Sequence, residues 1–169
     1  MSRLACATLL QRLHSLATSE ASLAPRTFQT EGDVHFIVQG LLARDLPRAL
    51  WTHEAHLAAV VAILAEHPDI RPETQMRDII SGYNVACGGV NDDTQGYHDT
   101  MTHIWIQIAR AHIAQFAGQP LLAMVNALVS GPDGDRNVPL RYYSRQRLFS
   151  VEARRSVLAP DLAPLPIPA

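Results

Sequence analysis

Two histidines, His53 and His56, lie three residues apart in a segment that predicts a helix. Residues at this spacing share one helix face, and neutral imidazole is a good ligand for zinc, iron or copper. On a helical wheel of about 100° per residue, His53 falls among the apolar residues of the following turns, and His56 lies within about 60° of them. The pattern predicts that both rings face the interior and can chelate one ion.

A third histidine, His98, begins a second predicted helix and shares a face with Met101 and Trp105, whereas His103 points away. Three inward histidines on two helices, with Asp99 beside His98, are what a three-histidine or three-histidine-plus-carboxylate metal site in a helical bundle requires. Such a site keeps a coordination position open for water or substrate. We therefore predict one divalent transition metal on His53, His56 and His98, with zinc favoured and iron, manganese or copper as alternatives.

Each of these histidines also has a structural interpretation. His98 could be a polar residue of a helix start, with Asp99 placed there because carboxylates favour the positive end of the helix dipole. His112, further along the same face, is expected to be a core histidine hydrogen-bonded to a neighbour. The metal site and the structural interpretation are both open at this level.

Candidate substrate contacts come from aromatic and amide side chains near the histidines. Trp51 and Trp105 predict an apolar pocket, and the loop region that contains Tyr83, Asn84 and Asn91 could hold a carboxylate or phosphate at a helix start. The same loop could equally serve only as a helix cap.

The chain after residue 136 is expected to be a C-terminal strap. It carries Tyr143, a candidate catalytic hydroxyl, and Arg147, a candidate substrate contact, and it ends in a proline-rich stretch. A strap of this kind over the mouth of a bundle would act as a lid.

The elements that must position these residues are helical. Apolar periodicity and capping signals predict helices over 3–18, 34–43, 48–66, 72–86, 96–116 and 120–130, and a short one near 151–158. Strand signals are nearly missing. We expect an all-α, single-domain helical bundle of about five to six helices over residues 1–169, with a helical core at about 3–130 and the strap at about 137–169.

Composition excludes several function classes. The chain has 169 residues, 47% hydrophobic and 18% charged, and a net charge of -2, which does not favour nucleic-acid binding. All 14 basic residues other than histidine are arginines, so Schiff-base, pyridoxal-phosphate and P-loop chemistry are excluded. Two cysteines make no disulfide framework, and no apolar run is long enough to span a membrane. We expect a cytoplasmic protein, with a homo-oligomer possible.

Several motifs together resemble an uncharacterised bacterial family of small helical proteins. They are Thr52-His53-Glu54-Ala55-His56-Leu57, Tyr97-His98-Asp99-Thr100, and Tyr142-Tyr143-Ser144 with the Arg147-Leu148-Phe149-Ser150 and Glu152-Ala153-Arg154 that follow. The resemblance covers about residues 35–165. It implies a site at His53, His56, His98 and Asp99, where glutamate is the family's usual residue at the last position; aspartate is shorter by one methylene.

Three functions are therefore expected to compete. The first is a metal-dependent enzyme acting on a small molecule in a hydrolytic, lyase-type or oxidative step, with Asp99 as ligand, orienter or general base. The second is a metal-free histidine and aspartate acid–base cyclase or isomerase. The third is a non-catalytic ligand-binding bundle in which the histidines are buried polar groups.

Overall fold

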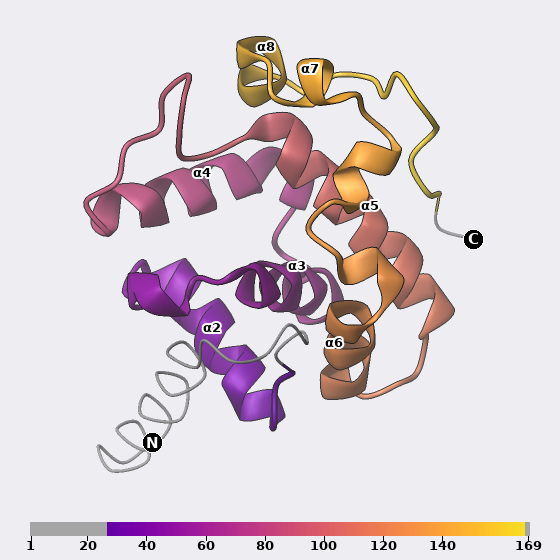
Figure 1. The fold of residues 1–169 in the computed structure, drawn as a ribbon. Helices are drawn as coiled ribbons and strands as arrows, with labels where there is room; N and C mark the ends of the chain where they lie inside the picture. Colours follow the sequence, from indigo (N-terminus) through magenta and orange to yellow (C-terminus); the bar gives the residue numbers. More distant parts are fainter. Residues whose placement is uncertain (1–26, 168–169) are drawn as a thin grey trace, which may run out of the picture.

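A computed structural model of the protein describes residues 27–167, and every regular element within this range is helical (Figure 1). This confirms the expected all-α class; the helix expected over 3–18 lies outside the described residues. The α-helices are α2 (Glu31–Ala43), α3 (His53–Glu66), α4 (Pro72–Ala86), α5 (Asp99–Gln115), α6 (Leu121–Ser130), α7 (Arg145–Leu148) and α8 (Val151–Arg155). Three 3₁₀ turns join them, at Arg48–Leu50, Pro132–Gly134 and Val138–Arg141.

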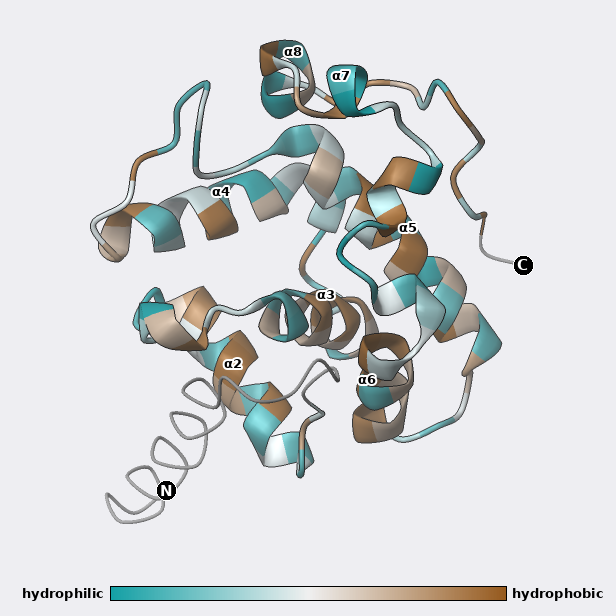
Figure 2. Ribbon diagram, viewed as in Figure 1, coloured by the Kyte–Doolittle hydropathy of each residue, from teal (hydrophilic) through white to brown (hydrophobic). Residues whose placement is uncertain are grey.

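Helix α3 is the centre of the core. It packs against α2, α5 and α6, and its residues from Leu57 to Ile63 are all buried. Four of these seven residues are alanine or valine with exposures of 1% or less, so neighbouring backbones can approach closely on several sides. Three of its four polar residues, His53, Glu54 and His56, lie at its N-terminal end, and the fourth, Glu66, ends the helix; Figure 2 shows the hydrophilic start of α3. The core therefore holds α3 rigidly while leaving its first turn for other contacts.

The start of α3 differs from the expected one. The segment expected to be helical from residue 48 forms a 3₁₀ turn at Arg48–Leu50, and α3 begins only at His53. Thr52 is the N-cap, because its side chain accepts a hydrogen bond from the backbone N–H of Ala55 at 3.3 Å. Trp51 thus precedes the helix, and His53 and His56 lie in its first turn.

Helix α5 also begins later than expected, at Asp99 rather than near Gly96. Asp92 and Thr94 in the preceding loop do not cap it. One oxygen of Asp92 instead accepts the N–H groups of Thr94 and Gln95, which closes a local turn in the loop before Gly96. His98 is the N-cap of α5.

The C-terminal segment after α6 packs along the N-terminal part of α5 (Figure 1). Its helices α7 and α8 are short, and residues 157–167 contain no helix. The buried Thr100 fastens this segment: its hydroxyl donates to the Ser156 carbonyl at 2.8 Å and accepts from the Leu158 N–H at 3.1 Å. Within the described range, no helix is long and apolar enough to cross a membrane.

Candidate active-site pocket

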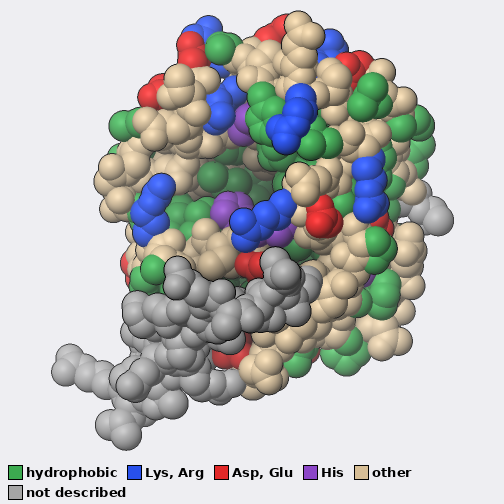
Figure 3. All heavy atoms as spheres, viewed as in Figure 1, with side chains coloured by type: hydrophobic (Ala, Val, Ile, Leu, Met, Phe, Trp, Pro, Cys, Tyr) green, Lys and Arg blue, Asp and Glu red, His purple; other side chains and the backbone are tan. Residues whose placement is uncertain are grey.

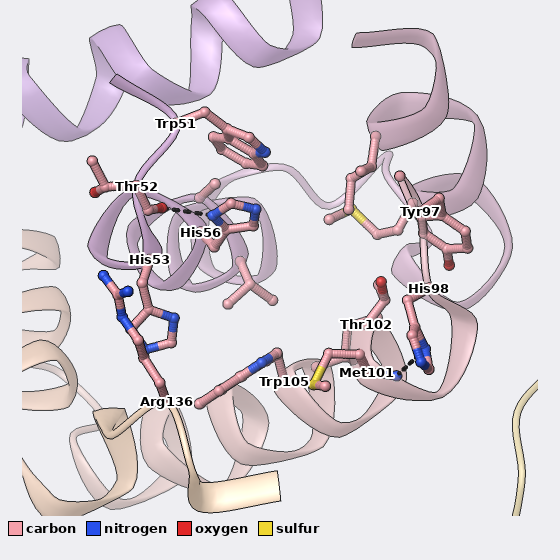
Figure 4. Close-up of a pocket in the computed structure, with 16 residues that line it drawn as sticks. Trp51, Thr52, His53, His56, Tyr97, His98, Met101, Thr102, Trp105 and Arg136 are labelled. Atoms are coloured by element: carbon pink, nitrogen blue, oxygen red, sulfur yellow. Dashed lines mark hydrogen bonds between the residues drawn. The ribbon is translucent and has the colours of Figure 1, made fainter. Parts of the chain in front are cut away.

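A pocket of about 600 Å³ opens between the first turns of α3 and α5 (Figures 3 and 4). Its walls are mainly apolar. Polar groups come from the starts of both helices and from Arg136, in the turn after α6. The lining residues are Trp51, Thr52, His53, His56, Ala59, Val60, Met76, Ile80, Gly96, Tyr97, His98, Met101, Thr102, Trp105, Ile106 and Arg136. A cavity of this size with few polar groups is typical of a small-molecule site.

His53 and His56 lie side by side on the α3 wall, and backbone carbonyls fix both rings (Figure 4). Nε2 of His53 donates to the carbonyl of Gly134 at 2.7 Å, and Nδ1 of His56 donates to the carbonyl of Thr52 at 2.6 Å. Because a neutral imidazole carries one N–H, the second nitrogen of each ring is left as an acceptor. In His56 that acceptor is Nε2, on the side of the ring away from Thr52.

Gly134 supports this arrangement by its lack of a side chain. A Cβ at this position would lie 2.1 Å from the carbonyl oxygen of Leu128. The 3₁₀ turn at Pro132–Gly134 therefore packs directly on the end of α6, and this close approach brings the Gly134 carbonyl to His53.

His56 is held as a neutral imidazole. Its side chain is exposed to the open space of the pocket, and partial desolvation by the pocket walls lowers the pKa of His56 to about 4. The charge of Arg136 acts in the same direction. The ring also lies against Trp51, with centroids 3.9 Å apart, while His53 meets the edge of Trp105 at 5.2 Å. Both predicted tryptophans thus line the pocket and contact the histidine pair.

His98 lies on the opposite wall and has both ring nitrogens engaged (Figure 4). Nδ1 accepts from the N–H of Met101 at 3.2 Å, and Nε2 donates to the carbonyl of Leu148 at 3.0 Å. Burial, followed by the charge of Arg154, lowers the pKa of His98, so this ring is also neutral. The ring joins the start of α5 to the C-terminal segment.

The three predicted metal ligands therefore line one pocket without forming a ligand cluster. In the part of the chain that the structure describes, no group of three or more His, Cys, Asp or Glu side chains is arranged to hold a metal ion. For His98 the physical reason is clear, because the lone pair needed for a metal is taken by its N-cap hydrogen bond.

Asp99 does not line the pocket. Its carboxylate pairs with the guanidinium of Arg77, which also donates to the carbonyl of Arg155 at 2.8 Å and lies 5.3 Å from the ring centre of Tyr97. The residue predicted as a ligand or general base thus joins α4, α5 and α8.

The other predicted polar contacts lie behind the pocket wall. Asn91 accepts from the Tyr97 N–H at 3.0 Å and from the Asn84 amide at 3.1 Å, so the two asparagines shape the loop that carries Tyr97 and His98. Tyr83 is fully buried against Trp51, and burial, then the neighbouring Cys87, raises the pKa of its hydroxyl. None of the three predicted residues lines the pocket.

Tyr143 and Arg147 hold the C-terminal segment in place. The Tyr143 hydroxyl donates to the carbonyl of Leu158 at 2.7 Å, and Nε of Arg147 donates to that of Ala159 at 2.8 Å. No described residue after Arg136 lines the pocket. The strap expected to be a lid instead packs behind the His98 wall.

Two further residues near the pocket are His112, whose role was expected, and Arg136, whose role was not. His112 is buried, bonds to the carbonyl of Met124 at 2.9 Å and stacks on Phe116, which confirms its expected role in the core. Arg136 lines the pocket and was not predicted. It belongs to a turn after α6, and only the packing of that turn on α3 brings it to the histidines.

Comparisons of the chain with protein-family models, with curated proteins and with solved structures found no match.

Proposed function

We propose that this protein binds a small, mainly apolar organic molecule in the pocket between α3 and α5. The observation that carries the proposal is the 600 Å³ cavity, whose apolar walls include both tryptophans and whose two imidazoles are fixed in one tautomer by backbone carbonyls. Preset hydrogen-bonding groups on an apolar surface select a ligand by shape and by one or two polar contacts.

His56 supplies the clearest polar contact. With a pKa of about 4, its Nε2 is unprotonated at neutral pH and accepts a hydrogen bond from a ligand hydroxyl or N–H. A base this weak has little driving force to remove a proton from a weak acid, since general bases work best with a pKa near the working pH. His56 therefore suits binding and orientation better than general-base catalysis.

The test uses a matched pair of naphthalenes. 2-Naphthol can donate a hydrogen bond to His56, whereas 2-methoxynaphthalene has the same body and no donor. Both are expected to quench the fluorescence of Trp51 and Trp105, with 2-naphthol bound about fivefold more tightly, since one net hydrogen bond is worth about 1 kcal/mol. His56→Phe should remove this difference, and His103→Phe, outside the pocket, should keep it. Absence of binding by both compounds, or a difference that survives His56→Phe, would contradict the proposal.

A second candidate, metal-dependent chemistry at His53 and His56, is favoured by one specific observation. Each ring donates one N–H to a backbone carbonyl, which is how protein ligands of metals are usually oriented. Zinc suits such a pair, and a metal held by two imidazoles would leave positions for water or substrate in a hydrolytic, lyase-type or oxidative step. The positive charge of Arg136 beside the pair opposes cation binding.

Calorimetric titration of tag-free, EDTA-treated protein with zinc separates the two candidates. Binding of about one equivalent that is lost in His53→Gln and His56→Gln but kept in His98→Asn would support the metal site. Binding below about a tenth of an equivalent would remove it and leave the small-molecule proposal standing.

A further inference from the structure

The charges around the pocket have one sign. Among the described residues that line it, Arg136 is the only one with a permanent charge, and none is an aspartate or glutamate. A cationic ligand would meet no counter-charge on the pocket wall, whereas an anionic one would meet a guanidinium.

Arg136 is free to make such a contact. It is exposed at the edge of the pocket beside His53 (Figure 4), and within residues 27–167 its side chain makes no hydrogen bond or ion pair. Arg77, Arg110, Arg141 and Arg155, by contrast, each pair with a carboxylate. A guanidinium has five N–H donors in a planar fork that matches the two oxygens of a carboxylate.

Glu54 is the acidic residue whose charge acts on Arg136, but it does not occupy the Arg136 guanidinium. Burial works to raise the pKa of Glu54, but hydrogen bonds from its own backbone N–H and from Thr52, together with the charge of Arg136, hold that pKa below its usual value. Glu54 is therefore ionised, yet no ion pair joins it to Arg136 and it does not line the pocket. Helices α3 and α5 also both begin at the pocket, so their dipoles add positive potential there.

The rest of the wall determines the body of the ligand. Trp51 and Trp105 flank the histidine pair, and Met76 and Met101 add flexible, polarisable surface to the pocket wall. Flat aromatic rings fit such a wall, because stacking and edge contacts need little rearrangement.

We propose that the ligand is an aromatic carboxylate, with its carboxylate on Arg136 and its ring system against the two tryptophans. This inference rests on the proposed function and adds the chemical class of the ligand. It requires no lid, since the guanidinium at the edge of the pocket can hold the charged group while the body is buried.

The test compares 2-naphthoate with 2-naphthamide, its neutral isostere, by tryptophan fluorescence at pH 7. The carboxylate should bind about tenfold more tightly, and 0.5 M salt should weaken it alone, because an exposed ion pair is screened. Arg136→Gln should abolish the preference. Arg71→Gln, which removes an exposed arginine outside the pocket, makes the same change in net charge and should keep it.

The outcomes separate this inference from the proposed function. If the amide binds as tightly as the carboxylate, or if Arg136→Gln keeps the preference, the carboxylate assignment is overturned and the binding pocket stands. If neither of these compounds nor 2-naphthol binds, the proposed function fails and the carboxylate assignment fails with it.

Discussion

At the scale of single residues, the environment of each histidine decides what its ring can do. His112 is buried in the core, and both ring nitrogens of His98 are hydrogen-bonded. His53 and His56 each have one ring nitrogen that is not hydrogen-bonded to the protein. The residue type is the same in all four positions. The number of nitrogen lone pairs that the fold leaves unused separates a structural histidine from a candidate functional one.

The lowered pKa of His56 predicts how stability depends on pH. The ring has a pKa of about 4 when folded and about 6.5 when unfolded, so between these values the unfolded state binds more protons. Its contribution therefore favours folding above pH 6.5 and is lost as the pH falls towards 4. In His56→Gln this loss is absent, so the variant should gain stability relative to the wild type as the pH is lowered from 7 to 4.5.

Urea unfolding of EDTA-treated protein at several pH values measures this difference. His103→Gln, which changes a half-buried histidine outside the pocket, should show a smaller pH-dependent difference from the wild type. A gap between wild type and His56→Gln that is constant over this range would contradict a neutral, desolvated His56.

At the scale of elements, helix starts build the pocket. Thr52 caps α3 and His98 caps α5, and each cap sets the direction in which the first-turn side chains leave the helix. Histidine is an unusual cap, because the residues that normally accept the N-terminal N–H groups are Ser, Thr, Asp and Asn. Its size lets the second nitrogen reach the Leu148 carbonyl on the C-terminal segment.

Substitutions of His98 should separate a capping role from metal ligation. His98→Ala removes the cap and is expected to lower the unfolding free energy by about 1–2 kcal/mol, whereas His98→Asn restores a cap and should recover about half of that loss. The unrecovered part belongs to the contact with Leu148. Urea unfolding measures both variants, and equal destabilisation by Ala and Asn would contradict the capping role.

At the scale of the whole molecule, the C-terminal segment supports the pocket from behind. Beyond Thr100, Tyr143 and Arg147, Asp161 accepts from the N–H and the hydroxyl of Ser144 at 2.8 and 2.6 Å. Arg154 adds bonds to the carbonyls of Gly96 and Tyr97 at 3.3 and 3.2 Å. The segment therefore determines where the His98 wall lies without touching the space inside the pocket.

Removal of residues 157–169 tests this role. The truncated protein should be less stable by several kcal/mol, because it loses the partners of Tyr143, Arg147 and Ser144, each net hydrogen bond being worth about 1 kcal/mol. At a temperature where it remains folded, its affinity for 2-naphthol should stay within about twofold of the full chain. Calorimetric melting and fluorescence titration measure the two effects, and a large loss of affinity with little loss of stability would indicate a lid.

The sequence alone determined the helices and placed the histidine pair on one of them, but both rings were expected in the interior, whereas His53 is half-buried and His56 is exposed to the pocket. Apolar periodicity and proline positions predicted the ranges of α4 and α6 closely. An apolar face of a helix, and a proline at or just before the helix start, are properties of the local sequence. The same signals placed the starts of α3 and α5 a few residues too early. The caps are Thr52 and His98, and their hydrogen bonds to the first-turn N–H groups depend on a local geometry that the pattern of residue types does not specify.

Only the tertiary structure decided which of the predicted residues share one space. It brought Trp51, His53, His56, His98 and Trp105 to one pocket, placed Asp99, Tyr83, Asn84, Asn91, Tyr143 and Arg147 outside it, and added Arg136 from a turn some 80 residues after His53. The reason is physical. Periodicity records which side of a helix is buried, but the partner of a ring nitrogen depends on how separate helices and turns pack, and that information is distributed over the whole core.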